Sequence, residues 1–231
     1  MRLSSLPTLS GWFDVELGGI PFFASSYNIA PQSVLPVVRL NPMSGSREFD
    51  LQRWGLVPSW AKEAKPGFST FNARSEEAVR KPAFREALKS RRCLVPADGF
   101  YEWQQVDTKT KQPFAIALTS GEPFAFAGLW ESWQPAQGPP LETFTILTVS
   151  PNEIMQPIHN RMPVILEPRD YDRWLAPGDP TRPPIDLLRP FPTEKMLAWP
   201  VSNRVGNVLN NDPELLDRIQ HSPQQIPVGL F

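Results

Sequence analysis

Short apolar segments separated by polar, proline-rich stretches run along the whole chain and predict a protein built mainly from β-strands. Runs rich in Phe, Ile, Val and Thr are typical of strands. The predicted strands are residues 34–40, 49–54, 112–118, 123–130, 143–149, 162–166 and 196–202. Loops are expected over residues 40–48 and 135–140.

A helical pattern covers residues 75–91, SEEAVRKPAFREALKSR. Ser75 stands where an N-cap is expected, and Pro82 predicts a split into two short helices because proline removes a backbone donor. Three more helices are expected, all of them short: 169–175, 184–189 and 212–219. No linker divides the chain. The prediction is one strand-dominated α+β domain over residues 1–222, followed by a tail over 223–231.

Composition restricts the classes of function. The 231 residues include 28 prolines, roughly twice the usual share of about 5 %, which favours short strands and loops. The net charge is −1, so any contact with nucleic acid must use a local basic face. One cysteine and two histidines exclude a disulfide framework and disfavour a zinc site, so no metal and no cofactor is expected.

The apolar segments are too short for a membrane protein. None reaches the roughly 20 residues that a membrane span needs. The first residues, MRLSSLPTLSGW, lack the apolar core of a signal peptide. We therefore expect a soluble, cytoplasmic protein.

A carboxylate stands among aromatic residues in the segment DGFYEW, residues 98–103. Glu102 follows an Asp-Gly turn within a longer run, CLVPADGFYEW, that reads as a buried strand. Loss of hydration in such surroundings raises the pKa of a carboxylate. Glu102 is therefore a candidate general acid or base.

Two other segments carry polar side chains in patterns that suit a site. In FNARSE, Asn72, Arg74 and Glu76 would share one face of an extended chain, either as a solvated surface or with Asn72 orienting a substrate and Arg74 holding a phosphate. In IHNRMPVIL, His159 stands beside Arg161 at the mouth of a predicted strand. Histidine titrates near neutral pH and could form an acid/base pair with a glutamate.

Two segments rich in aromatic residues and proline have both a packing and a binding interpretation. YNIAP covers residues 27–31, and RWGLVPSW covers residues 53–60. Their tryptophans suit core or loop packing. Next to arginine they would also suit a platform on which nucleic-acid bases stack.

The segments YNIAP, WGLVPSW, FNARSE, RRCLVPADGFYEW, IHNRMPVIL and PVSNRVGNV occur in the order found in the SOS-response-associated peptidase (SRAP) family, which the chain resembles over about residues 20–210. The resemblance implies a curved, barrel-like mixed sheet with short flanking helices. It implies a monomer that binds single-stranded DNA, or a single-strand/duplex junction, at an abasic site. In this family a cysteine at position 2 forms an imine and then a thiazolidine ring with the abasic sugar, and autopeptidase-type chemistry accompanies it.

The resemblance also assigns site residues by matching motifs. Asn72, Glu102 and His159 correspond to catalytic residues of the family. The positions matched to its DNA-binding groove are Arg2, Asn28, Pro31, Trp54, Gly55, Pro58, Trp60, Arg74, Thr148, Arg161, Ser202 and Asn207.

The chain departs from the family pattern at its start. The family begins Met-Cys-Gly-Arg, whereas this chain begins Met1-Arg2, which shortens the extended chain by about 7 Å. Cys93 is expected to be buried and inert, because it lies in a strand-like segment without assigned chemistry. An error in the recorded sequence, an altered start and a true loss of the covalent step all remain open.

Three hypotheses about function follow. The first is a DNA-repair protein that crosslinks to abasic sites. The second is a module that recognises abasic or single-stranded DNA without a covalent bond. The third is a small-molecule hydrolase using Glu102 and His159, which is disfavoured because no nucleophile lies in a recognisable elbow.

Overall fold

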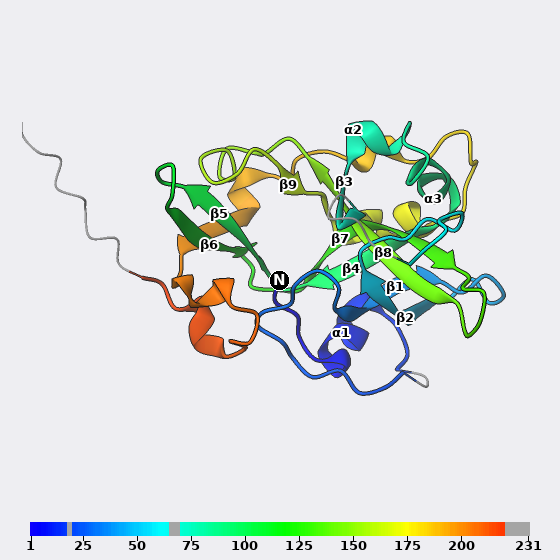
Figure 1. The fold of residues 1–231 in the computed structure, drawn as a ribbon, viewed down its shortest axis with the longest axis horizontal. Coiled ribbons are helices and arrows are strands. Elements are labelled where there is room, and N and C mark those ends of the chain that lie inside the picture. The colour runs from blue at the N-terminus through cyan, green and yellow to red at the C-terminus, as the bar shows by residue number, and fades with distance from the viewer. Residues whose placement is uncertain (18–19, 65–69, 220–231) are drawn as a thin grey trace, which may run out of the picture.

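The computed structural model describes residues 1–17, 20–64 and 70–219 (Figure 1). The expected boundary between domain and tail at residue 222 lies outside these ranges. Within them, two β-sheets and a few short helices form a strand-dominated α+β domain, as the sequence predicts.

Five strands of the larger sheet close into a ring. They are β1 (Val34–Leu40), β2 (Arg47–Trp54), β4 (Arg92–Ala97), β7 (Phe124–Trp133) and β8 (Leu141–Val149). The pairing runs β7–β4–β1–β2–β8 and returns from β8 to β7. The β2–β8 pair is parallel and the other four are antiparallel. The predicted curved, barrel-like mixed sheet is therefore confirmed.

Three short strands extend the rim of this barrel. They are β3 (Asn72–Arg74), β9 (Met162–Pro163) and β10 (Ile165–Leu166). Strand β3 is parallel to β8, whereas β9 is antiparallel to β8 and β10 is antiparallel to β7. Apolar side chains fill the ring, and every residue of β4 is buried.

A second, three-stranded sheet stands beside the barrel. Its order is β11 (Met196–Pro200), β6 (Lys111–Leu118) and β5 (Phe100–Gln105). The run of residues 93–103 is thus not one strand, as the sequence suggested, but two strands in different sheets. The break falls at Gly99, where an added Cβ would lie 2.8 Å from the carbonyl oxygen of Ile116. Only glycine permits this close approach.

The helices are short. The α-helices are α1 (Leu6–Phe13), α2 (Ser75–Ala78), α3 (Arg85–Ser90) and α4 (Tyr171–Leu175). The described 3₁₀ turns are Pro168–Asp170, Ile185–Leu187, Thr193–Lys195, Asn203–Gly206 and Pro213–Leu216. Among the described residues, no helix is long and apolar enough to cross a bilayer.

The helix predictions were right in part. The expected break at Pro82 separates α2 from α3, but Ser75 is the first residue of α2 and not its cap. Residues 212–219 and 184–189 form only single 3₁₀ turns. Helix α1 was not predicted. It buries Leu6, Leu9 and Phe13.

Substituting Gly128 should destabilise the barrel. A Cβ there would lie 2.7 Å from both the Cys93 Sγ and the Val95 Cγ2 on β4. We expect Gly128→Ala to lower the free energy of unfolding by about 1–3 kcal/mol, since overpacking forces neighbouring groups to move. Gly11→Ala is the control, because nothing lies within 4 Å of its added Cβ. In helix α1 this change should stabilise by up to about 1 kcal/mol. Equal effects in urea unfolding would contradict the packing argument.

Candidate functional site

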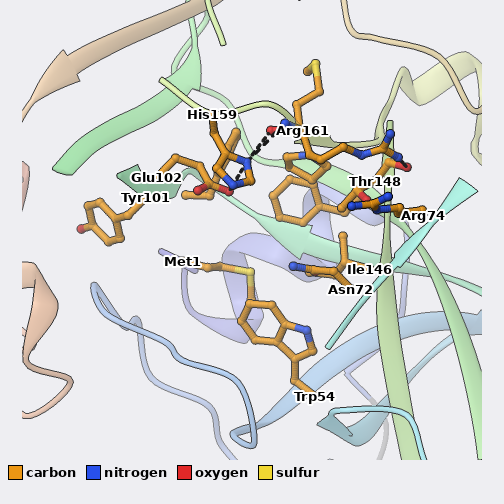
Figure 2. A pocket seen from close by; sticks show the side chains of 14 residues that line it. Met1, Trp54, Asn72, Arg74, Tyr101, Glu102, Ile146, Thr148, His159 and Arg161 are labelled. Carbon is orange, nitrogen blue, oxygen red and sulfur yellow. Dashed lines mark hydrogen bonds and ion pairs between the residues drawn. The ribbon is translucent and has the colours of Figure 1, made fainter. Parts of the chain in front are cut away.

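A pocket lies between the small sheet and the rim of the barrel (Figure 2). Its volume is about 260 Å³. Both sheets, the end of β2, the loop before β9 and the first residue of the chain contribute to its walls. The lining residues are Met1, Trp54, Asn72, Arg74, Phe100, Tyr101, Glu102, Phe126, Ile146, Thr148, His159, Arg161, Met162 and Pro163.

Glu102 and His159 lie together at one side of this pocket. The Glu102 Oε1 is 4.0 Å from the His159 Nδ1, which is too long for a hydrogen bond. The same nitrogen lies 3.0 Å from the carbonyl oxygen of Arg161 and 3.3 Å from its backbone nitrogen. The backbone of Arg161 therefore fixes the orientation of the imidazole beside the carboxyl group.

Burial raises the pKa of the Glu102 carboxyl group above its ordinary value, and the charge of His159 opposes this rise. The direction agrees with the sequence analysis. The surroundings differ from those expected, because Trp103 is 37 % exposed and does not line the pocket. The pocket walls, rather than both flanking aromatic rings, exclude water from Glu102.

The Met1 amine is enclosed by the protein. It donates a hydrogen bond of 2.8 Å to the carbonyl oxygen of Ile29, and the Met1 side chain lines the pocket, as Trp54 does (Figure 2). Burial lowers the pKa of this amine from its ordinary value of 8.0 to about 5, and the charge of Glu102 partly opposes the shift. At neutral pH the amine is therefore uncharged and has a free lone pair. Although the chain is short at its start, Met1 reaches the site.

Strand β3 directs two polar side chains to the pocket. Asn72 and Arg74 point to one face, and Ala73 between them is buried in the core. This is the alternation that an extended segment imposes. Among the described residues, Arg74 has no carboxylate within ion-pair distance, so its guanidinium is available to an anion. Glu76 has left the strand and lies on α2.

Arg161 is already paired. Its two terminal nitrogens lie 2.6 and 2.9 Å from the carboxylate oxygens of Glu76, and one of them also donates to the carbonyl oxygen of Thr148 at 2.6 Å. The hydrogen bonds from Arg161 lower the pKa of Glu76 to about 2. A phosphate that binds Arg161 must therefore compete with a carboxylate.

The two tryptophans that resemble a stacking platform differ in exposure. Trp54 is only 9 % exposed, stacks on Phe144 and donates from Nε1 to the carbonyl oxygen of Phe71. It forms a wall of the pocket and offers no open face. Trp60 is 67 % exposed but does not line the pocket.

Other predicted binding residues lie outside the pocket. Asn28 donates from its side chain to carbonyl oxygens of Val205, Asn207 and Asn210, so it ties two segments together. Ser202 accepts a hydrogen bond from the backbone of the turn that it precedes. The predicted residues that do not line the pocket are Arg2, Asn28, Pro31, Gly55, Pro58, Trp60, Ser202 and Asn207.

Cys93 lies in the core and not in the site. It is fully buried in β4, and burial raises the pKa of its thiol. This confirms the expectation that it is buried. The described residues contain no cluster of three or more histidine, cysteine, aspartate or glutamate side chains suited to a metal ion.

Part of the pocket gave no signal in the sequence. Met1 was not among the expected site residues, and the apolar walls from Phe100, Phe126 and Met162 read as ordinary core. Tyr101 also lines the pocket, and its position next to Glu102 in the sequence could have indicated this. Its hydroxyl donates to the carbonyl oxygen of Tyr27 at 2.9 Å, which ties β5 to the segment before Ile29.

A family model and individual relatives place the chain in the same family. The model of the SOS response associated peptidase (SRAP) family matches residues 8–208. The chain is 48% identical over 195 residues to the abasic site processing protein YoqW of Bacillus subtilis, covering 83% of this chain and 85% of that protein. It is 37% identical over 229 residues to the abasic site processing protein HMCES of Gallus gallus, covering 86% and 67%.

Solved structures share the fold. A protein from Bacteroides thetaiotaomicron has a TM-score of 0.72 at 30% identity, over 82% of both chains. A protein from Bordetella bronchiseptica has a TM-score of 0.73 at 27% identity, over 87% of this chain and 99% of the other.

Titration of Met1 tests the electrostatics of the pocket. We expect the amine of a protein whose first residue is Met1 to titrate near pH 5. Glu102→Gln should lower this pKa further, because the carboxylate stabilises the ammonium form. The measurement is the pH dependence of the Met1 Cα and Hα chemical shifts. Asp107→Asn, on the exposed β5–β6 turn, is the control and should have no effect. A midpoint near 8.0, the ordinary value, would contradict the burial of the amine.

Proposed function

The chain belongs to the SOS response associated peptidase family, and on this premise we propose that it processes abasic sites in DNA. Abasic site processing is what the names of its relatives state. A role in DNA repair during the SOS response agrees with the description of the family.

One observation carries the proposal: Met1, whose buried amine has a lowered pKa, lines the same pocket as Glu102, whose carboxyl group has a raised pKa. An abasic sugar in its open form presents an aldehyde. A neutral amine attacks an aldehyde, whereas an ammonium group does not. The pocket thus supplies the nucleophile in its reactive form and, in Glu102, a group that can give and take a proton.

The proposed reaction is formation of an imine. The Met1 nitrogen attacks the aldehyde carbon, a C–N bond forms, and a proton passes from nitrogen to oxygen to give a carbinolamine. Protonated Glu102 then protonates the hydroxyl group, the C–O bond breaks and water leaves. The resulting carboxylate removes the remaining proton from nitrogen, which restores Glu102 and leaves the imine.

The neighbours of Glu102 have supporting roles in this proposal. His159, at 4.0 Å from the carboxyl group, would accept or return protons between turnovers. Asn72 would bind the sugar hydroxyls, since its amide lines the pocket and has both a donor and an acceptor. Arg74 at the same wall would hold a flanking phosphate.

We propose single-stranded DNA, or its junction with a duplex, as the substrate. An abasic sugar must leave the helix to enter a pocket of this size, and a single strand permits this without breaking base pairs. Arg74, which has no carboxylate within ion-pair distance in the described part of the chain, supports a phosphate contact at the pocket.

The second candidate is recognition without a covalent bond. It is favoured by the side chain of Met1, the residue next to Arg2, because Met1 carries no thiol that could close a thiazolidine ring on the imine. The two candidates differ in whether the imine forms. Autopeptidase-type activity, which the family description suggests, would appear as a change in the intact mass of the protein.

Trapping with a reductant distinguishes these candidates. Protein verified by mass to begin at Met1 is incubated with an abasic oligonucleotide, with and without cyanoborohydride. We expect a covalent adduct at Met1 with the reductant and little heat-stable adduct without it, because an imine hydrolyses or leads to strand cleavage. Glu102→Gln should slow trapping by about 10²–10⁴-fold. Denaturing gels and peptide mass spectrometry give the readout.

Inserting Cys-Gly between Met1 and Arg2 is the matched gain-of-function variant. Once Met1 is removed from it, the free cysteine should give a heat-stable crosslink. Strong heat-stable crosslinking by the protein without the insertion would overturn this account. No trapping at all would favour the non-covalent module.

Salt dependence tests the phosphate contact. The logarithm of affinity for single-stranded DNA should fall linearly with the logarithm of salt concentration, by about 0.7 per phosphate contact. We expect Arg74→Ala to remove one contact, weaken binding to all sequences alike and reduce the slope by about 0.7. Arg173→Ala is the control, because Arg173 is paired with Asp186 outside the pocket. A slope that Arg74→Ala leaves unchanged argues against the contact.

A further inference from the structure

Asp98 is a buried carboxylate outside the pocket. Its side chain is only 3% exposed. Oδ1 accepts a hydrogen bond of 3.0 Å from the Ser4 hydroxyl. Oδ2 has no hydrogen-bond partner among the described residues, and the Arg2 Nε lies 3.9 Å from it.

Burying Asp98 in this way lowers the stability of the fold, so packing does not explain why a carboxylate stands here. A buried carboxylate that is only partly hydrogen-bonded loses hydration without full compensation. Burial raises the pKa of Asp98, and Ser4 and Arg2 only partly oppose this shift. Its side chain does not line the pocket, so Asp98 touches no substrate there.

Within the ranges that the structure describes, the hydrogen bonds and the ion pair of Asp98 all go to Arg2 and Ser4. Its backbone N–H donates to the Arg2 carbonyl oxygen at 3.0 Å, and the Arg2 N–H donates to the Gly99 carbonyl oxygen at 2.9 Å. The side chain of Asp98 reaches Arg2 and Ser4 on the same segment. The segment is therefore held by both backbone and side-chain bonds.

The same turn also leads into the strand that carries Glu102. Gly99 is packed against the Ile116 carbonyl oxygen, and β5 begins at the next residue. The turn at Asp98 and Gly99 therefore holds both the segment that carries the Met1 amine and the strand that carries Glu102.

We propose that Asp98 is a positioning residue, which holds Arg2 and Ser4 so that the Met1 amine enters the pocket at a fixed place relative to Glu102. The role in the reaction rests on the proposed function. The role in placing the segment does not.

Arg2 then has a structural task, whereas the family resemblance implied a contact with DNA. Its guanidinium lies near Asp98 and 5.9 Å from the centre of the Tyr27 ring. Tyr27 in turn accepts a hydrogen bond from Tyr101 on β5. Arg2 therefore connects the turn to the wall of the pocket, and this contact competes with a contact to DNA.

The test compares three variants. Asp98→Ala removes the contacts to Ser4 and Arg2. Asp98→Asn keeps an oxygen for Ser4 but loses the charge, and Ser4→Ala removes the other half of that hydrogen bond. Glu131→Gln is the control, because Glu131 is also a buried carboxylate, paired with Arg91 away from the pocket.

Two readouts are used on each variant. Hydrogen exchange at the Arg2 and Leu3 amides reports how firmly the segment is held. The rate of reductive trapping on abasic DNA, with affinity measured separately, reports the placement of the amine. For Asp98→Ala we expect exchange at least about tenfold faster and trapping about tenfold slower, with affinity changed less than twofold. Asp98→Asn should retain more of both properties, and Glu131→Gln should leave both unchanged.

Unchanged exchange and trapping in Asp98→Ala would overturn the proposal. If Asp98→Ala does not fold, Asp98→Asn and Ser4→Ala decide in its place: faster exchange at Arg2 and Leu3 supports the proposal, and wild-type exchange overturns it. Absence of trapping in the unmodified protein is a failure of the proposed function. Hydrogen exchange at the Arg2 and Leu3 amides needs no DNA, so it still tests whether Asp98 holds the first segment in place.

Discussion

A Cβ atom at position 99 would lie 2.8 Å from the carbonyl oxygen of Ile116, so only glycine fits there. Strand β4 of the barrel ends two residues before Gly99 and β5 of the small sheet begins directly after it, so this contact lies where the chain passes from one sheet to the other. The pocket is the space left between them, with Glu102 on one wall and β3 on another. A larger residue at position 99 would press on the backbone of Ile116 in β6, so β5 and β6 would have to shift beside the pocket.

The strand content was predictable because it depends on local pattern. Segments such as 34–40 and 143–149 are apolar and β-branched, and they are strands β1 and β8 in the structure. The closure of the barrel was not predictable from pattern, since pairing of β2 with β8 joins segments far apart in the chain. Helix α1 was missed because its sequence, LPTLSGWF, contains both proline and glycine, and tertiary burial of Phe13 compensates for them.

The chemistry of single residues was also easier to foresee than their partners. A carboxylate next to aromatic residues marked Glu102, and a histidine beside an arginine marked His159, and the two lie 4.0 Å apart. The ion pair of Arg161 with Glu76 links residues 85 positions apart, which no local pattern indicates. Met1 was missed for a related reason. The sequence shows how long the first segment is, but it does not show that this segment bonds to the turn at Asp98 and Gly99.

The placement of Met1 has a practical consequence for producing the protein. The amine is enclosed and bonded to Ile29, and the side chain lines the pocket (Figure 2). Residues fused ahead of Met1, such as an affinity tag or the remnant left by a protease, would have to run through that space. They would turn the amine into an amide, which is no longer a nucleophile, beside a pocket that Met1 lines. A preparation made in this way would look well folded and yet be a poor sample for testing the chemistry.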